Sequence, residues 1–392
     1  MTEHTQIGII GAGPAGLLLS QVLHLQGIDS IVVERRSPEY VLGRVRAGAL
    51  EPGMVKFLRA AGIGERLDRE GHPHKGIAIA FEDKRFRIDM EELTGGGYLT
   101  IYGQTKITED LMAARAERGS NLVYEIGDTS IHDLDADRPS IRYSKDDEEH
   151  EIRCDFIAGC DGFHGISRPT IPGDVLKTFD RKYPYHWIAL LTESRPVSEE
   201  LIYVHHERGF VLCSMRSPTQ SRYGIQCGTE DTVDDWSEDR IWSEISARLS
   251  PDLADSLDTG ACLDKSIVPK RSFVAEPMQY QRLFLAGDAA HIVPPTGAKG
   301  LNLAGSDVYY LSRAFIEYYG TGRTDLLGAY GATALDRVWK AEWFSGWMTE
   351  LLHANPNHGP YDRRAQIAQL RLLSQSRAAQ TALAQSYVGV PY

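Results

Sequence analysis

The chain has 392 residues, 42% hydrophobic and 24% charged, a composition typical of a soluble globular protein with a sizeable core. Its formal net charge of −12 argues against nucleic acid as the main partner, because phosphate backbones are bound by basic surfaces. The five cysteines form no C-x-x-C pair, which argues against a disulfide framework or a zinc site and favours a reducing, cytoplasmic location.

The chain begins with the polar stretch "MTEHTQ", which runs directly into an apolar strand and predicts no signal peptide. No apolar run approaches the ~18 residues that a membrane-spanning helix needs. We therefore expect a cytoplasmic protein with no membrane association and no metal ion, which binds a small ligand.

The first predicted elements form a βαβ unit. An apolar run over 7–10 predicts a buried parallel strand, a G-x-G-x-x-G fingerprint follows over 11–16, and a helical pattern runs on to Gly27. A second apolar strand, "SIVVE", ends in Glu34. The fingerprint residues are Gly11, Gly13 and Gly16.

This unit predicts a binding site for an adenine dinucleotide. Glycines let the backbone approach a pyrophosphate, the helix N-terminus stabilises its charge, and Glu34 can accept a hydrogen bond from a ribose hydroxyl. The alternative is a tight glycine turn in a purely structural unit. The fingerprint alone does not distinguish NAD from FAD.

A cluster of arginines follows this acid. Arg35, Arg36, Arg44 and Arg46 all lie within "RRSPEYVLGRVRAG". Such a cluster is usually a solvated basic face. Here it comes directly after the predicted ribose-binding acid, where a phosphate-rich ligand would lie.

Two later segments repeat the pattern of a strand followed by a loop. "CDFIAGCDGFHGISR" predicts a strand followed by Asp161, and "RLFLAGD" predicts a strand followed by Asp288. An aspartate cannot hold a diphosphate by charge, but it can accept a hydrogen bond from a ribityl hydroxyl. The helix predicted from Gly300 points N–H groups at an electron-rich ligand. The first loop and the Asp288 loop would thus bind two ends of one long ligand, which predicts FAD.

The three motifs, in this order, resemble those of the group A flavoprotein aromatic hydroxylases. Longer stretches are similar to the 4-hydroxybenzoate 3-hydroxylases of that family: "YVLGRVRAG", "YGQT", "AGCDGFHGISR", "HIVPPTGAKGLNLA", "WKAE" and "YVGVPY". The resemblance covers nearly the whole chain and is weaker over 128–150, 228–262 and 353–380.

The resemblance implies an α/β fold with a doubly wound, Rossmann-like FAD domain, a β-sheet substrate domain and a helical C-terminal part. We expect the FAD domain over 1–180, with 73–98 crossing to the substrate sheet, and the substrate domain over 181–270. Residues 271–392 would complete the FAD site and form the helical interface of a homodimer. Strand-like runs in the middle of the chain and helical patterns towards its end agree with this division.

The resemblance also implies substrate contacts. Tyr203 would contact the substrate phenol, and the carbonyl of Pro295 would lie near the reacting hydroxyl. Ser214 and Arg216 would bind the substrate carboxylate. From the residues alone, an internal ion pair is the commoner explanation of a buried Arg216, and core packing the commoner explanation of Tyr203.

A proton relay is implied by the same resemblance. It would run from Tyr203 through Tyr387 to a surface histidine, His74, and so to water. Without the resemblance, His74 would be read as an ordinary surface residue and Tyr387 as a packing residue near the C-terminus.

The cofactor contacts come from the fingerprint and from the resemblance together. Those expected for FAD are Gly11, Gly13, Ala15, Gly16, Glu34, Arg44, Arg46, Ala47, Gly48, Gln104, Asp161, Asp288, Leu301 and Asn302. Those expected near NADPH, bound on an open surface, are Arg35, Tyr40, Arg44, Arg46, His164 and Arg271.

The implied enzyme is an FAD-dependent monooxygenase that hydroxylates 4-hydroxybenzoate at the 3 position with NADPH and O2, through a flavin C4a-hydroperoxide. Two alternatives remain. One is the same chemistry on another para-substituted benzoate, such as 4-aminobenzoate or protocatechuate. The other is an FAD-binding protein without oxygenase activity. The sequence departs from the family at Gly224, where a tyrosine beside the substrate carboxylate is common, and we expect this glycine to leave space for water or a larger ligand.

Overall fold

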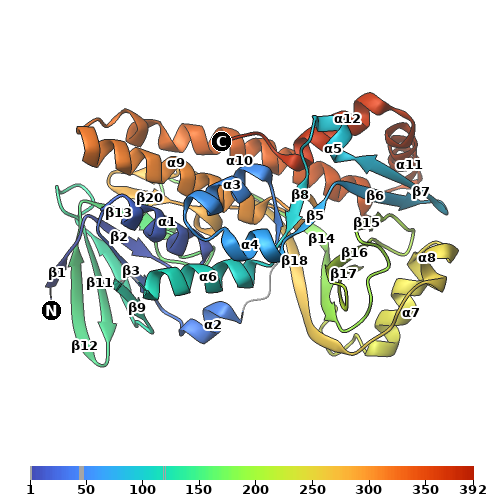
Figure 1. The fold of residues 1–392 in the computed structure, drawn as a ribbon, viewed down its shortest axis with the longest axis horizontal. Coiled ribbons are helices and arrows are strands. Elements are labelled where there is room, and N and C mark those ends of the chain that lie inside the picture. The colour runs from blue at the N-terminus through green and yellow to red at the C-terminus, as the bar shows by residue number, and fades with distance from the viewer. Residues whose placement is uncertain (1, 44–47, 118, 120) are drawn as a thin grey trace.

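The computed structural model describes residues 2–43, 48–117, 119 and 121–392. It has a large sheet towards each end of an elongated molecule, two smaller sheets beside these, and long C-terminal helices running along one side (Figure 1). Three residues expected at FAD, Arg44, Arg46 and Ala47, lie outside the described residues.

The predicted βαβ unit is confirmed. It consists of β2 (Ile7–Ile10), α1 (Pro14–Leu25) and β3 (Ser30–Glu34), and the two strands pair in parallel. All four residues of β2 are buried, as its continuous apolar run predicts.

The other two motifs follow neighbouring strands of the same sheet, whose order is β19-β20-β13-β2-β3-β9. Strand β13 (Phe156–Gly159) lies parallel to β2 on one side and to β20 (Leu283–Leu285) on the other. The sheet is completed by β9 (Asn121–Tyr124) and β19 (Gln279–Tyr280). Because parallel strands end at the same edge, the three loops all leave the sheet on one side.

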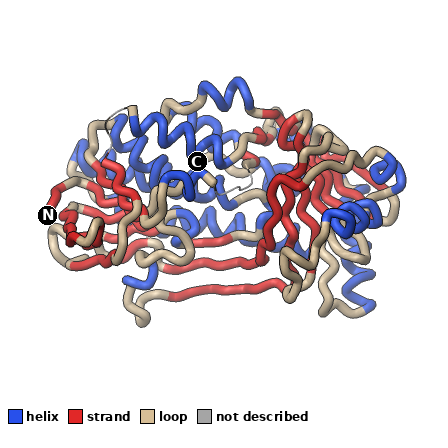
Figure 2. Tube along the Cα trace, turned by 90° about the horizontal axis from the view of Figure 1, so that it is seen from below, coloured by secondary structure: helices blue, strands red, loops and turns tan. Residues whose placement is uncertain are grey.

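A second sheet of eight strands has the order β21-β18-β14-β17-β16-β15-β6-β7. Its two longest strands extend from this sheet towards the other end of the molecule (Figure 2). The strand-like runs expected in the middle of the chain are confirmed. The strands are β6 (Gly76–Phe81), β7 (Lys84–Asp89), β14 (Lys177–Thr192), β15 (Leu201–Val204), β16 (Val211–Ser217), β17 (Gln220–Cys227), β18 (Cys262–Glu276) and β21 (His291–Ile292).

The expected C-terminal helices are confirmed as α9 (Gly300–Thr321), α10 (Asp325–Leu352), α11 (Pro360–Gln375) and α12 (Arg377–Val388). The last predicted helical run is divided at Ser376, whose side chain accepts a hydrogen bond from the N–H of Ala379 and so begins α12. No helix in the described part of the chain is long and apolar enough to cross a membrane.

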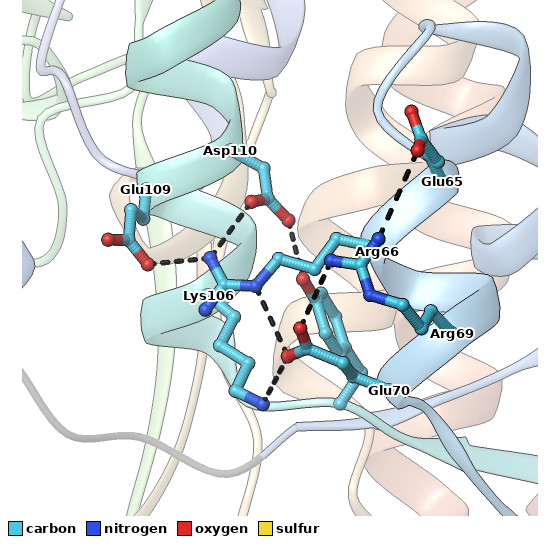
Figure 3. Close-up of polar contacts among 8 residues, drawn as sticks. Glu65, Arg66, Arg69, Glu70, Lys106, Glu109 and Asp110 are labelled. Atoms are coloured by element: carbon cyan, nitrogen blue, oxygen red, sulfur yellow. Dashed lines mark hydrogen bonds and ion pairs between the residues drawn. The ribbon is translucent and has the colours of Figure 1, made fainter.

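A small sheet lies between the two large ones and carries His74. It contains β4 (Ala49–Leu50), β8 (Leu99–Ile101) and β5 (His72–His74). Strand β5 closely follows helix α4 (Glu65–Glu70), and a network of ion pairs ties α4 to α6 (Gln104–Ala116) (Figure 3). At its centre, Arg66 lies 2.7 Å from Glu109 and 3.2 Å from Glu70.

The remaining elements complete the two ends of the molecule. Helices α7 (Glu238–Arg248) and α8 (Pro251–Asp255) lie where the family resemblance is weak and were not predicted. The others are β1 (Thr2–His4), β10 (Thr129–His132), β11 (Ser140–Lys145), β12 (Glu148–Arg153), α2 (Pro38–Leu42), α3 (Pro52–Ala60) and α5 (Met90–Thr94).

Candidate flavin and substrate site

The three fingerprint glycines have different environments. Gly11 has φ +104, and a Cβ atom there would lie 2.4 Å from the carbonyl oxygen of Cys160. A Cβ atom on Gly16 would lie 1.9 Å from the carbonyl oxygen of Gly11. A Cβ atom on Gly13 would have no described neighbour within 4 Å. Positions 11 and 16 have no room for a side chain, so glycine is required there. The space beside Gly13 is open and leaves room for a ligand against the N-terminus of α1.

Glu34 lies at the end of β3 beside this loop. Its Oε2 accepts a hydrogen bond from the N–H of Ala12, and its Oε1 accepts one from the N–H of Arg36, each at 2.9 Å. The carboxylate lines a cavity of about 360 Å³ together with Gly11, Arg35, Asp161 and His164. Three residues expected at FAD, Gly11, Glu34 and Asp161, therefore line one cavity together with two residues expected near NADPH, Arg35 and His164.

Asp161 has one satisfied and one unsatisfied oxygen. Its Oδ2 accepts hydrogen bonds from the N–H and the hydroxyl of Ser167, each at 2.9 Å. Its Oδ1 is buried and has no partner among the described residues. Burial raises the pKa of this carboxyl. A hydroxyl group of a bound dinucleotide could donate the missing hydrogen bond to this buried oxygen.

The Gly-Asp loop and the start of α9 face the same edge of the sheet. Asp288 is exposed in a short turn after β20, and Leu301 and Asn302 lie in the first turn of α9. The Asn302 side chain makes its hydrogen bonds within the protein. It accepts one from the N–H of Glu51 and donates to two backbone carbonyls, all at 2.9 Å. The backbone N–H groups of this first helical turn are the donors left for a ligand.

Two further expected FAD contacts lie close to the substrate side. A Cβ atom on Gly48 would lie 2.0 Å from the carbonyl oxygen of Tyr102, so only glycine fits there. Gln104 begins α6, directly after Gly103. The guanidinium of Arg216 lies against Gly103, 3.5 Å from where its Cβ would be. This arginine thus borders the predicted flavin site. Together the open glycine, the two helix N-termini and the orphan carboxylate fit FAD.

The residues expected near NADPH are spread over the surface. Arg35, Tyr40 and His164 are exposed. Arg271 forms a two-point ion pair with Asp180, with both N–O distances 2.6 Å. A phosphate of a nucleotide would have to compete with this carboxylate for Arg271.

Tyr203 and Tyr387 meet in the interior. Tyr203, on β15, is 2% exposed, and Tyr387, on α12, is 1% exposed. Their hydroxyls are hydrogen bonded to each other, and the Tyr203 hydroxyl also donates to the carbonyl of Thr296 at 3.1 Å. Burial raises the pKa of both phenols, so both stay protonated at neutral pH. Thr296 follows Pro295 and was not predicted from the sequence. The Pro295 carbonyl accepts the N–H of Ala298 at 3.0 Å.

Ser214, one of the two expected carboxylate-binding residues, lies on the same face of the sheet as Tyr203. Tyr203 is paired with Leu212 on β16, and Ser214 follows two residues later, so both side chains point to one side. Burial lowers the pKa of the Arg216 guanidinium, as desolvation does for any cation. A guanidinium can bind a carboxylate through two parallel N–H groups, which is the contact expected of Arg216.

His74 differs from its expected position at the surface. It is 1% exposed, and both ring nitrogens are buried without a hydrogen-bond partner among the described residues. Burial lowers its pKa to about 4. The prediction of a surface histidine is wrong, because His74 pairs with Leu99 of β8 in the interior, a tertiary contact that local sequence does not reveal.

The family profile described as "FAD binding domain" matches residues 4–345 of the chain. The chain is 50% identical to a p-hydroxybenzoate hydroxylase of Acinetobacter baylyi over 100% of its own length and 96% of that protein. The chain belongs to the FAD-dependent aromatic hydroxylases.

Two more distant similarities concern one sequence and one solved structure. A rifampicin monooxygenase of Streptomyces venezuelae is 27% identical over 83% of this chain and 67% of that protein. The crystal structure of a p-nitrophenol 4-monooxygenase of Pseudomonas putida superimposes with a TM-score of 0.81 at 17% identity, covering 99% of each chain.

Two buried lysines of this hydroxylase were missed by sequence reasoning. Lys299 donates to Glu51 at 2.6 Å and to the carbonyl of Tyr387 at 2.8 Å, which fixes the end of α12 beside the start of α9. Lys270, on β18, is 2% exposed, and its Nζ lies 3.5 Å from the ring centroid of Trp187 with no hydrogen-bond partner among the described residues. The motif "GAKGLN" could have indicated Lys299. No sequence signal distinguishes Lys270 from an exposed lysine of a strand.

Proposed function

We propose that the chain is a 4-hydroxybenzoate 3-hydroxylase, which forms 3,4-dihydroxybenzoate with NADPH and O2. The observation that carries the proposal is the buried, hydrogen-bonded pair of Tyr203 and Tyr387, in which Tyr203 lies on the sheet face that also bears Ser214. The 50% identity to a p-hydroxybenzoate hydroxylase supports it. FAD, when bound, supplies the redox chemistry: it accepts a hydride from NADPH and activates O2.

The tyrosine pair would make the substrate ring reactive. A free phenol has a pKa of ~10, so about one molecule in a thousand is ionised at neutral pH. The anion is the electron-rich form that attacks an electrophilic oxygen. Lowering the phenol pKa by ~2 to 3 units requires ~3 to 4 kcal/mol of extra stabilisation of the anion. The Tyr203 hydroxyl, protonated because it is buried, would donate to the phenolate, and Tyr387 would take the displaced proton onwards.

Arg216 and Ser214 would hold the other end of the substrate. A carboxylate bound to a partly buried guanidinium fixes the ring in one orientation, since the two N–H groups of arginine match its two oxygens. With the carboxylate at Arg216 and the phenol oxygen at Tyr203, the ring would lie across the sheet face. The carbon next to the hydroxyl would then face the flavin side, near Pro295, in agreement with hydroxylation at the 3 position.

The division into domains and the assembly are part of the same proposal. Residues 1–180 and the first part of 271–392 would hold FAD, with 73–98 and 181–270 forming the substrate sheet. NADPH would bind at the open surface near Arg35, Tyr40, His164 and Arg271. The exposed tryptophans of α10, Trp339 and Trp343, are 40% and 65% exposed, and a second copy of the chain in a homodimer would cover such a surface.

Substrate-stimulated oxidation of NADPH tests this function. The FAD-loaded protein is mixed with NADPH and, separately, with 4-hydroxybenzoate, 4-aminobenzoate or 3,4-dihydroxybenzoate, and the loss of NADPH absorbance is followed. We expect the largest stimulation with 4-hydroxybenzoate. A larger stimulation by one of the others would assign a different substrate, and no stimulation by any of them would leave an FAD-binding protein of another function.

A further inference from the structure

The proposed proton relay needs an outlet beyond His74. The ring of His74 is buried, and its pKa of about 4 keeps it neutral at pH 7. A neutral imidazole can accept a proton on one nitrogen and release another from the second, so it can pass a proton without storing it. The cost of the transient imidazolium then limits how fast a proton passes.

Glu200 lies close to this histidine in space, at the start of the neighbouring eight-stranded sheet, and its charge acts on the ring. Strands β15 and β6 are parallel, with Leu201 paired with Ile77. The residue before each, Glu200 and Gly76, therefore lie next to each other, and Gly76 is two residues after His74. The same segment reaches Tyr203 three residues after Glu200. Tyr203 thus lies on β15, and His74 lies just before β6, the strand that pairs with β15.

The carboxylate of Glu200 is ionised and partly exposed to solvent. Arg87 donates to its Oε2 at 2.6 Å and to its Oε1 at 2.8 Å, and Arg87 also donates to Asp89 at 2.7 Å. Arg87 is the main cause that lowers the pKa of Glu200. The side chains of Glu200 and Arg87 are 23% and 43% exposed. Exposure therefore increases from the buried His74 through Glu200 to Arg87.

The charges around His74 act in opposite directions. Glu200 raises the pKa of His74, and His72, on the same strand, lowers it. Lys75, the residue after His74, forms an exposed ion pair with Glu91 at an N–O distance of 3.0 Å. The two charges of this pair largely cancel each other at the His74 ring. Glu200 is therefore the group that favours a positive charge on the His74 ring.

We propose that Glu200, held by Arg87, is a positioning residue of the proton exit: its carboxylate stabilises His74 as a proton passes from Tyr387 to water. The inference rests on the proposed function, because the proton comes from the phenol of the bound substrate. The O–H bond of that phenol breaks, each group of the relay gains one proton and loses one, and a water molecule at the surface takes the proton. No group of the protein changes its charge overall.

Two substitutions with opposite electrostatic effects test this proposal. Glu200→Gln removes the negative charge, and Arg87→Gln breaks the same ion pair but leaves the carboxylate in place. The holoenzyme with bound 4-hydroxybenzoate is mixed rapidly with buffer of higher pH, and the absorbance of the phenolate is followed. Glu91→Gln, which removes an equal charge from the neighbouring surface pair, is the matched control.

We expect Glu200→Gln to slow phenolate formation by about tenfold, the change that corresponds to one pKa unit at His74. Arg87→Gln should leave the rate unchanged or raise it, and Glu91→Gln should match wild type. Equal slowing by Glu200→Gln and Arg87→Gln would mean that the ion pair only supports the fold and would overturn the proposal. An unchanged rate in Glu200→Gln would overturn it as well.

A titration of His74 separates this inference from the proposed function. The ring protons of His74 are followed by NMR without substrate and are assigned by their loss in His74→Asn. We expect a lower pKa of His74 in Glu200→Gln and a higher one in Arg87→Gln, and no change in either variant would overturn the inference. If wild type binds no 4-hydroxybenzoate as phenolate, the proposed function fails, whatever the titration shows.

Discussion

A Cβ atom built on Gly224 would lie 2.7 Å from Cε3 of Trp187. The indole is 5% exposed, and its Nε1 donates to His353 at 2.6 Å, so it is held firmly in this place. Our expectation that Gly224 leaves space for water or a larger ligand is therefore wrong. The space beside the glycine is filled by a side chain from the neighbouring strand β14.

We predict that Gly224→Tyr destabilises the protein and does not tighten the binding of 4-hydroxybenzoate. Overpacking of a filled core costs about 1 to 3 kcal/mol, because Trp187 or the backbone must move. Thermal unfolding and substrate titration measure the two effects. Gly328→Tyr, where a Cβ atom would meet no described atom within 4 Å, is the control. A variant as stable as wild type with tighter binding would show that Trp187 moves aside freely.

Lys270→Met should stabilise the protein, by about 1 to 4 kcal/mol, because it replaces an unpaired buried amine by an apolar side chain of similar length. Burial lowers the pKa of Lys270 below that of the unfolded chain, which is ~10.4. The unfolded state therefore binds the extra proton, and the penalty grows as the pH falls below ~10.4.

The gain from Lys270→Met should consequently be large at pH 7 and shrink as the pH approaches ~10.4, which unfolding in denaturant at several pH values measures. Lys340→Met, at a side chain that is 65% exposed, should change stability by less than about 0.5 kcal/mol at any pH. A loss of stability in Lys270→Met would mean that the contact of its amine with Trp187 outweighs the cost of burying it.

The flavin loops could be predicted because their signal is local. Gly16 is required by a contact with Gly11 inside one βαβ unit, and the division of the last helices at Ser376 is a capping signal of a single residue. The burial of His74 and the contact between Lys270 and Trp187 could not be predicted. They depend on which strands become neighbours in the sheet and which helices cover them, and these are contacts between distant parts of the chain.

Arg216→Ala should weaken the binding of 4-hydroxybenzoate by about 10- to 150-fold, which corresponds to the ~1.5 to 3 kcal/mol of a charge-assisted contact. The FAD content should stay close to that of wild type. Substrate titration and the flavin absorbance measure both, and Arg85→Ala, at an exposed arginine of β7, is the control. Equal dissociation constants would mean that Arg216 serves an internal ion pair.

Tyr203→Phe should still oxidise NADPH in the presence of substrate but release mostly hydrogen peroxide. The variant keeps the aromatic packing and loses the hydroxyl that would stabilise the substrate phenolate. The substrate would then stay a neutral phenol, whose ring is too poor in electrons to be hydroxylated. The ratio of product formed to NADPH consumed measures this. A ratio equal to that of wild type would remove Tyr203 from the proton relay.

Identification of the product tests the central claim most directly. The FAD-loaded protein is incubated with NADPH, 4-hydroxybenzoate and oxygen enriched in the heavy isotope, and the product is analysed by mass spectrometry. We predict 3,4-dihydroxybenzoate with one labelled oxygen, at the carbon next to the original hydroxyl. Oxidation of NADPH with the substrate recovered unchanged, or a product without the label, would contradict the assignment of this chain as a 4-hydroxybenzoate 3-hydroxylase.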